Sequence, residues 1–216
     1  MENPIRVIPA ILTDSPEALE TMVSLAETFT DRVQLDIMDG RFVPSCSITA
    51  ENVAGINTRL HWEAHLMTEH PASYLEGFKQ AGAERVIFHY EAADPPREVI
   101  SQAKVMGLDI GIAVNPDTPA TSISLLVDDI DCILFMSVHP GFYGSRFIPG
   151  VLDKIIGFRQ AYPDMEIGID GGIKESNIAS VARSGANSIC VGSAIFCQKN
   201  PIESYKRLTA LANEAL

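Results

Sequence analysis

The sequence has no paired cysteines and no long apolar runs. Its cysteines form no C-x-x-C pair and no zinc-finger spacing, so neither a disulfide framework nor a cysteine-based zinc site is expected. Cys132 and Cys190 lie inside apolar runs and are predicted to be core thiols. No apolar run reaches the ~18 residues of a membrane span, and the first residues show no secretory signal pattern. We therefore expect a reduced, cytoplasmic protein with no membrane partner.

Positive charge is also scarce. Lys and Arg total 16 against 28 Asp and Glu, which gives a net charge of −12. This balance argues against a nucleic-acid groove, although backbone N–H groups could still bind the phosphate of a small molecule. With 216 residues, 46% of them apolar, and no Ser/Gly linker, the sequence predicts a single domain over 1–216.

Apolar runs alternate with helix signals along the whole chain. Thr13-Asp14-Ser15-Pro16 predicts a helix start, and Gly82, Gly107 and Gly185 are expected to follow helix ends. Such alternation predicts an α/β protein, a closed (β/α)₈ TIM barrel. An open doubly wound sheet is the rival fold, but no G-x-G-x-x-G follows the first strand. The strands are expected at 6–10, 32–38, 61–66, 85–89, 109–114, 132–138, 166–170 and 188–191.

Polar side chains occur near the carboxyl ends of three of these strands. Asp36 and Asp170 follow buried apolar residues, and His65 lies near the end of 61–66. In a barrel the carboxyl ends of the strands form the active site. Side chains alternate along a strand, so Gln34, Asp36 and Met38 are expected on one face. Two carboxylates and an imidazole at one end of a barrel indicate acid–base chemistry around a metal ion.

The sequence also resembles the ribulose-phosphate 3-epimerase family along nearly its whole length. Six motifs occur in the family's order, and together they are far more specific than any one of them. They are 35–44 (LDIMDGRFVP), 64–67 (AHLM), 113–116 (AVNP), 136–142 (MSVHPGF), 169–173 (IDGGI) and 192–196 (GSAIF).

The resemblance implies a function and a set of site residues. Members of this family invert C3 of a ketose phosphate, interconverting ribulose 5-phosphate and xylulose 5-phosphate. Asp36 and Asp170 match the two acid–base groups, and with His65 they match ligands of a divalent metal ion such as zinc, manganese or iron. We expect a homo-oligomer. The sugar-phosphate substrate is expected to contact a larger set of residues. That set is His65, Met38, Met67, Met136, Gly141, Phe142, Tyr143, Gly144, Gly171, Gly172, Gly192 and Ser193.

Two positions depart from the family pattern. Gln34 stands where the family has a metal-binding His, and an amide oxygen is a much poorer zinc ligand than imidazole. Ala10 stands where the family has a substrate-binding Ser. Two alternatives therefore stay open: an epimerase-like enzyme for a different ketose phosphate, and a non-catalytic sugar-phosphate-binding relative. A decarboxylase is disfavoured, because no D-x-K-x-x-D array is present.

Overall fold

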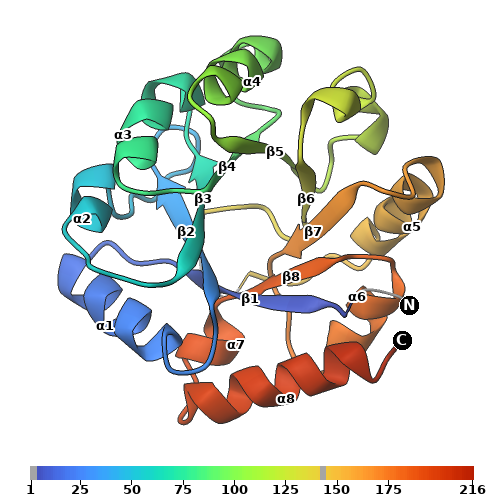
Figure 1. Ribbon diagram of the computed structural model, residues 1–216. Coiled ribbons are helices and arrows are strands. Elements are labelled where there is room, and N and C mark those ends of the chain that lie inside the picture. Colours follow the sequence, from blue (N-terminus) through green and yellow to red (C-terminus); the bar gives the residue numbers. More distant parts are fainter. Residues whose placement is uncertain (1–3, 142–144) are drawn as a thin grey trace.

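Eight parallel strands pair in sequence order, and the last strand pairs with the first, so the sheet closes into a barrel (Figure 1). The computed structural model describes residues 4–141 and 145–216. The expected (β/α)₈ barrel is therefore confirmed. The strands are β1 (Arg6–Ile11), β2 (Arg32–Met38), β3 (His61–Met67), β4 (Arg85–His89), β5 (Asp109–Val114), β6 (Cys132–Met136), β7 (Glu166–Asp170) and β8 (Ser188–Val191).

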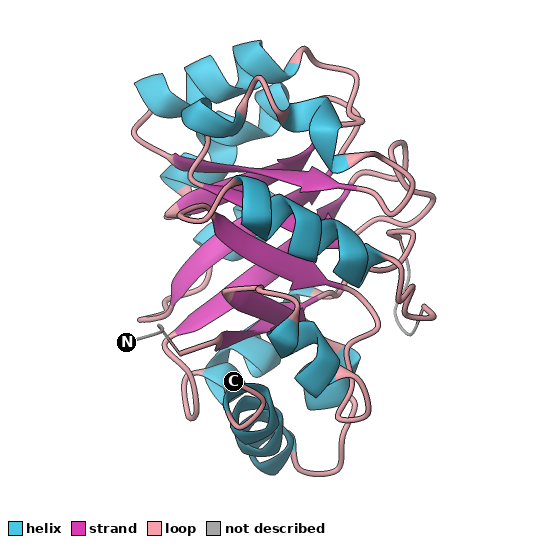
Figure 2. Cartoon of the chain, turned by 90° about the vertical axis from the view of Figure 1, so that its right-hand side faces the viewer, coloured by secondary structure: helices cyan, strands magenta, loops and turns pink. Residues whose placement is uncertain are grey.

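Helices surround this sheet on its outer side (Figure 2). Between β5 and β6 the chain forms two short 3-10 helices, η2 (Ala120–Ile123) and η3 (Val127–Asp129), in place of the longer helix of a regular β/α unit. Among the described residues no helix is both long and apolar enough to cross a bilayer. The helices are α1 (Pro16–Ala26), α2 (Ala50–Ala54), η1 (Pro71–Tyr74), α3 (Leu75–Gln80), α4 (Pro96–Val105), η2 (Ala120–Ile123), η3 (Val127–Asp129), α5 (Val151–Ala161), α6 (Ile178–Arg183), α7 (Ser193–Phe196) and α8 (Pro201–Asn213).

The helix boundaries follow from local chemistry. The Ser15 hydroxyl accepts a hydrogen bond from the backbone N–H of Ala18 at 3.1 Å, and Pro16 opens α1. Gly107 follows α4 with a φ of +67°, a left-handed conformation that L side chains rarely adopt. Both the expected helix start at Ser15-Pro16 and the expected stop at Gly107 are confirmed.

The strands separate two sets of side chains. On β2, Val33, Leu35 and Ile37 pack outward into the large core between the sheet and the helices. The alternate residues point into the barrel, so the parity expected from the sequence is confirmed. A smaller apolar cluster fills the middle of the barrel; it contains Ile8, Ala10, Ile87, Ala113, Cys132, Leu134, Met136 and Cys190.

An ion cluster fills the barrel interior at the amino ends of the strands. Arg85 donates to both carboxylate oxygens of Glu166 at 2.8 and 3.0 Å, and its Nη1 lies 3.5 Å from Glu63. Burial raises the pKa of Glu63, while the Arg85 charge opposes that rise. The amino end of the barrel is thus closed by a guanidinium between two carboxylates.

Candidate active site

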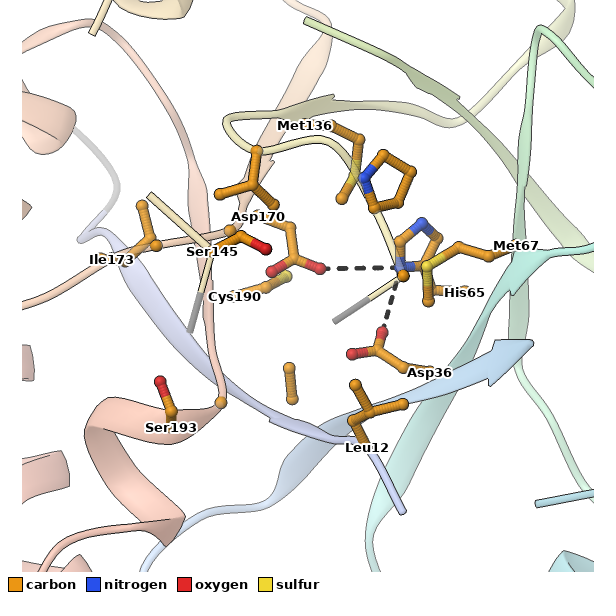
Figure 3. A pocket seen from close by; sticks show the side chains of 17 residues that line it. Leu12, Asp36, His65, Met67, Met136, Ser145, Asp170, Ile173, Cys190 and Ser193 are labelled. Atoms are coloured by element: carbon orange, nitrogen blue, oxygen red, sulfur yellow. Dashed lines mark hydrogen bonds and ion pairs between the residues drawn. The ribbon is translucent and has the colours of Figure 1, made fainter. Parts of the chain in front are cut away.

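Asp36, His65 and Asp170 meet at the carboxyl end of the barrel. They come from β2, β3 and β7, and strand register places Asp36 beside His65. His65 Nδ1 lies 3.0 Å from Asp36 Oδ1 and 3.6 Å from Asp170 Oδ2. Dashed lines mark both contacts in Figure 3. Each residue offers one ligand atom, and these atoms lie within 4.8 Å of one another. The three residues singled out by the sequence are therefore brought together.

Gln34 lies directly beneath this group and is fully buried. Its Nε2 donates to Asp36 Oδ1 at 2.9 Å and to Asp170 Oδ2 at 2.8 Å. Its Oε1 accepts a hydrogen bond from Cys190 Sγ at 3.1 Å. The amide thus bridges the two carboxylates through nitrogen.

The electrostatics of the group are set by burial and by the closeness of the two carboxylates. Burial and the neighbouring Asp36 charge raise the pKa of Asp170 to about 7. Burial alone would lower the pKa of His65, but the Asp36 hydrogen bond and the charges of both aspartates outweigh it and raise that pKa. Carboxylates this close favour a state in which the pair holds one proton.

Behind His65 a second polar pair continues away from the pocket. His65 Nε2 lies 3.0 Å from His89 Nε2, and His89 Nδ1 lies 3.4 Å from Glu91 Oε2. Burial lowers the pKa of His89 to about 4, so its ring stays neutral near pH 7. Glu91 is held in turn by the Asn115 N–H at 2.8 Å and by the Thr118 hydroxyl.

Glycines form the rim of the pocket between β7 and β8. Gly171 and Gly172 follow β7 with φ values of +110° and +65°. A Cβ on Gly172 would lie 2.8 Å from the backbone nitrogen of Phe147, so this turn requires glycine. The pocket lining also includes Gly192, Ser193 and Gly141. Phe142, Tyr143 and Gly144, also expected at the substrate, lie outside the described residues.

The sequence profile of the ribulose-phosphate 3 epimerase family matches residues 6–196. The chain belongs to that family. A ribulose-phosphate 3-epimerase of Synechocystis is 37% identical, covering 94% of this chain and 93% of its own. Another from Chlamydia trachomatis is 35% identical over 88% of this chain and 85% of its own.

Solved structures share the fold of this epimerase-family chain. A 3-hexulose-6-phosphate synthase superposes with a TM-score of 0.72 at 19% identity and covers 96% of this chain and 99% of its own. An orotidine 5'-phosphate decarboxylase from Pyrococcus horikoshii gives 0.70 at 15% identity, covering 95% of this chain and 98% of its own. At such identities the likeness concerns the barrel alone.

The methionines expected at the substrate lie at the mouth of the barrel. Met67 and Met136 line the pocket with Asp36 and Asp170 (Figure 3). Met38 lies in a small apolar cluster with Met67 and Val43 and is not among the described residues that line the pocket. The wall near β1 is apolar and contains Ala10 and Leu12.

Three of the four residues expected to hold a metal ion have the right chemistry. Asp36 and Asp170 offer oxygens and His65 offers an imidazole nitrogen, a set that suits a divalent cation. Gln34 faces the same oxygens with its amide nitrogen, which carries hydrogens and cannot act as a ligand. The donor set therefore fits a cation held by three side chains of this chain.

Proposed function

We propose that this chain inverts C3 of a ketose phosphate, interconverting ribulose 5-phosphate and xylulose 5-phosphate. The observation that carries the proposal is the convergence of Asp36 and Asp170 on one pocket at the carboxyl end of the barrel. The relatives of similar length and 35–37% identity are named for this reaction.

The two aspartates would act as base and acid on opposite faces of C3. A carboxylate removes the C3 proton beside the carbonyl, which leaves an enediolate, and the other carboxyl returns a proton on the far side. A pair that shares one proton begins each turnover with one base and one acid in place. In the cation-free chain, burial and the Asp36 charge raise the pKa of Asp170 to about 7, which supports a shared proton in that state.

Asp36, His65 and Asp170 would hold a divalent cation, and zinc, manganese and iron all accept this ligand set. A bound cation would act as a Lewis acid and lower the energy of the enediolate oxygens. His65 would hold its place through the contact of its Nε2 with His89. Metal analysis of the purified protein identifies the cation.

We further propose that the substrate phosphate binds backbone N–H groups at Gly171, Gly172, Gly192 and Ser193. Barrels commonly bind phosphate at the loops after the last two strands. Replacing Gly192 with valine would put a branched side chain at this rim, and we expect it to abolish measurable sugar-phosphate binding in calorimetry. The matched control is Gly157→Ala, since a Cβ there meets no atom within 4 Å. Normal binding by Gly192→Val would remove this phosphate site.

A second substrate assignment has one observation in its favour. Ala10, buried in the pocket wall, cannot hydrogen-bond a sugar hydroxyl. An epimerase for a different ketose phosphate therefore remains the alternative. Comparing kcat/KM over a panel of ketulose phosphates separates the two, and a preference for a substrate other than a pentulose 5-phosphate would favour the alternative.

The decisive experiment is solvent exchange. Incubation with ribulose 5-phosphate in D₂O should give xylulose 5-phosphate carrying deuterium at C3, followed by NMR. Heat-inactivated protein and the Asp170→Asn variant are the controls. Binding of the sugar phosphate without exchange at C3, for any divalent cation added, would leave only the non-catalytic binding protein.

We also propose that residues 1–216 form one domain that works as a homo-oligomer in the cytoplasm. The described cysteines are all free, which fits a reducing compartment. A relative from rice, 36% identical over 80% of this chain and 78% of its own, is named a cytoplasmic isoform. Light scattering after size-exclusion chromatography measures the oligomeric state, and a monomer mass would contradict this part of the proposal.

A further inference from the structure

The Gln34 carboxamide contacts three polar side chains, one on its own strand β2 and one each on the paired strands β7 and β8. Its nitrogen contacts one oxygen each of Asp36 and Asp170, and its oxygen contacts the thiol of Cys190. Gln34, Cys190 and both aspartates are at least nine-tenths buried. The amide of Gln34 and the thiol of Cys190 are out of reach of solvent, so the neighbouring side chains determine the partner of each end of the amide.

The orientation of the amide follows from the chemistry of its neighbours. An ionised carboxylate only accepts hydrogen bonds, and when the pair holds one proton its other oxygens still only accept, so the NH₂ end faces Asp36 and Asp170. The Cys190 thiol can donate to the amide oxygen, and burial raises its pKa well above the ordinary value, so it keeps its hydrogen. Rotating the amide by half a turn would set its oxygen against two carboxylates and leave the thiol without an acceptor.

The oxygens that the amide contacts are the ones a cation would need. Asp36 Oδ1 and Asp170 Oδ2 are also the oxygens nearest to His65 Nδ1, at 3.0 and 3.6 Å. The amide nitrogen lies 2.9 and 2.8 Å from the same two atoms. A cation bound next to His65 Nδ1 would therefore approach the same two oxygens that the amide hydrogens already contact.

We propose that Gln34, held in this orientation by Cys190, competes with the divalent cation and is not one of its ligands. The proposal rests on the cation site assigned above. In this chain the amide ties the two carboxylates together when no cation is bound, and a cation binds only by breaking those two hydrogen bonds. Cys190 is a positioning residue, because it acts on the carboxylates through Gln34.

The direction in which one substitution changes cation affinity shows whether Gln34 competes with the cation or binds it. Gln34→Leu keeps the size of the side chain and removes all of its hydrogen bonds. If Gln34 competes, the variant should bind Mn²⁺ about tenfold more tightly, because hydrogen bonds to charged groups no longer have to break. Mn²⁺ affinity is measured by electron paramagnetic resonance, and Zn²⁺ affinity by competition with a chromophoric chelator. Unchanged or weaker binding by a folded Gln34→Leu protein would overturn the proposal.

Cys190 supplies a second test that leaves Gln34 in place. Cys190→Ala frees the amide to turn its oxygen toward the cation, so Mn²⁺ affinity should rise a few-fold. Cys190→Ser is the matched control, because its hydroxyl can still donate to the amide oxygen and should keep the wild-type affinity. Equal affinities for the alanine and serine variants would show that Cys190 does not hold the amide. Gln34→His raises affinity on either reading and is not diagnostic.

These measurements need no turnover, so their failure and the failure of the proposed reaction are distinct. A protein without exchange at C3 whose Gln34→Leu variant binds Mn²⁺ more tightly would disprove the reaction and support the competition. An active enzyme whose Gln34→Leu variant binds Mn²⁺ more weakly would do the reverse.

Discussion

A pair of carboxylates lies at each end of the barrel, and the two pairs have different partners. At the amino end Glu63 and Glu166 share the guanidinium of Arg85, which carries a permanent charge. At the carboxyl end, the described side chains that contact both Asp36 and Asp170 are the imidazole of His65 and the neutral amide of Gln34. The first pair therefore has a permanently charged side chain beside it, whereas the second has a titratable imidazole and a neutral amide.

The carboxylates at the amino end therefore have a structural role, and those at the carboxyl end a chemical one. A guanidinium that bridges two carboxylates gains nothing from a further ligand, and any loss leaves a buried charge unpaired. The carboxyl end instead keeps two carboxylates that gain from an added proton, a cation or a polar substrate. Charge is therefore left partly uncompensated at the end where the pocket opens.

The largest expected effect comes from removing one acid–base group. Asp36→Asn or Asp170→Asn should lower kcat for epimerisation by about 10²–10⁴-fold, the range for loss of general acid–base catalysis. Circular dichroism and the melting temperature should show that the barrel persists. If either variant kept wild-type turnover, the catalytic assignment would be wrong.

At the amino end of the barrel, loss of a charged side chain should lower the free energy of unfolding and leave kcat unchanged. Arg85→Met leaves the buried Glu63 carboxylate without its cation and should cost about 3 kcal/mol of unfolding free energy, the lower end of the usual loss when a buried ion pair is broken, because the second partner, Glu166, is partly exposed. Urea titration measures it, and kcat per folded molecule should be unchanged. The control is Arg97→Met, whose exposed pair with Asp129 should contribute about 0–1 kcal/mol. A loss of kcat in folded Arg85→Met would show that the two ends are coupled.

The raised pKa of Asp170 predicts how stability depends on pH in cation-free protein. The pKa is 3.8 for an ordinary Asp and about 7 in the folded chain, where burial and Asp36 raise it. Below pH 4 the carboxyl is protonated in both states, and its contribution to stability is fully present. Between pH 4 and 7 only the unfolded chain releases the proton, so stability falls by at most about 1.4 kcal/mol per pH unit.

Asp170→Asn cannot release that proton and should lack this loss. Urea unfolding at pH 4.5 and at pH 8 measures the difference, with chelator present throughout. Asp128→Asn, at an exposed carboxylate, is the control and should follow the wild type. Parallel pH profiles for wild type and Asp170→Asn would mean that Asp170 is not protonated in the folded protein.

The smallest effect on metal affinity and activity is expected from a change at Glu91, which contacts His65 only through His89. Glu91→Gln puts an NH₂ group within reach of His89 Nδ1, which favours the tautomer in which His89 donates to His65 through Nε2. His65 would then keep its own hydrogen on Nδ1, the nitrogen that faces the aspartates. Loss of such a supporting contact typically costs about 10–100-fold in metal affinity or activity.

Nitrogen-15 NMR of the imidazole rings reports the tautomer directly. Asp94→Asn, which alters the exposed His70–Asp94 pair, is the matched control and should change neither quantity. Unchanged His65 shifts and unchanged Mn²⁺ affinity in Glu91→Gln would contradict a positioning role for Glu91.

Much of this fold could be predicted, because strand periodicity and strand-end chemistry are local in sequence. The bounds expected for β2, β4, β5, β7 and β8 agree with the structure, and the shared inward face of Gln34 and Asp36 follows from alternation alone. The strand expected over 132–138 ends at Met136, because the Ser137 side chain bonds the backbone oxygens of Asp170 and Gly171. These two contacts span 33 and 34 positions of the sequence, so no local pattern indicates them.

The site could be located from the sequence, whereas its internal contacts could not. Asp36, His65 and Asp170 were identified at strand ends, and the structure brings them together. His89 was left without a role, although it shares the inward parity of Arg85 on β4. Which atom of Gln34 faces the aspartates depends on Cys190, 156 positions away, and composition and periodicity carry no information about such an orientation.

The Gln34 bridge also has a genetic consequence. Glutamine and histidine codons differ only in their third base. A single nucleotide change can therefore replace the Gln34 carboxamide with an imidazole. The neighbouring aspartates and His65 need not change for that exchange. One mutational step at position 34 could therefore change the cation affinity of this barrel, to suit a scarce or a plentiful supply of transition metal, with the rest of the pocket kept intact.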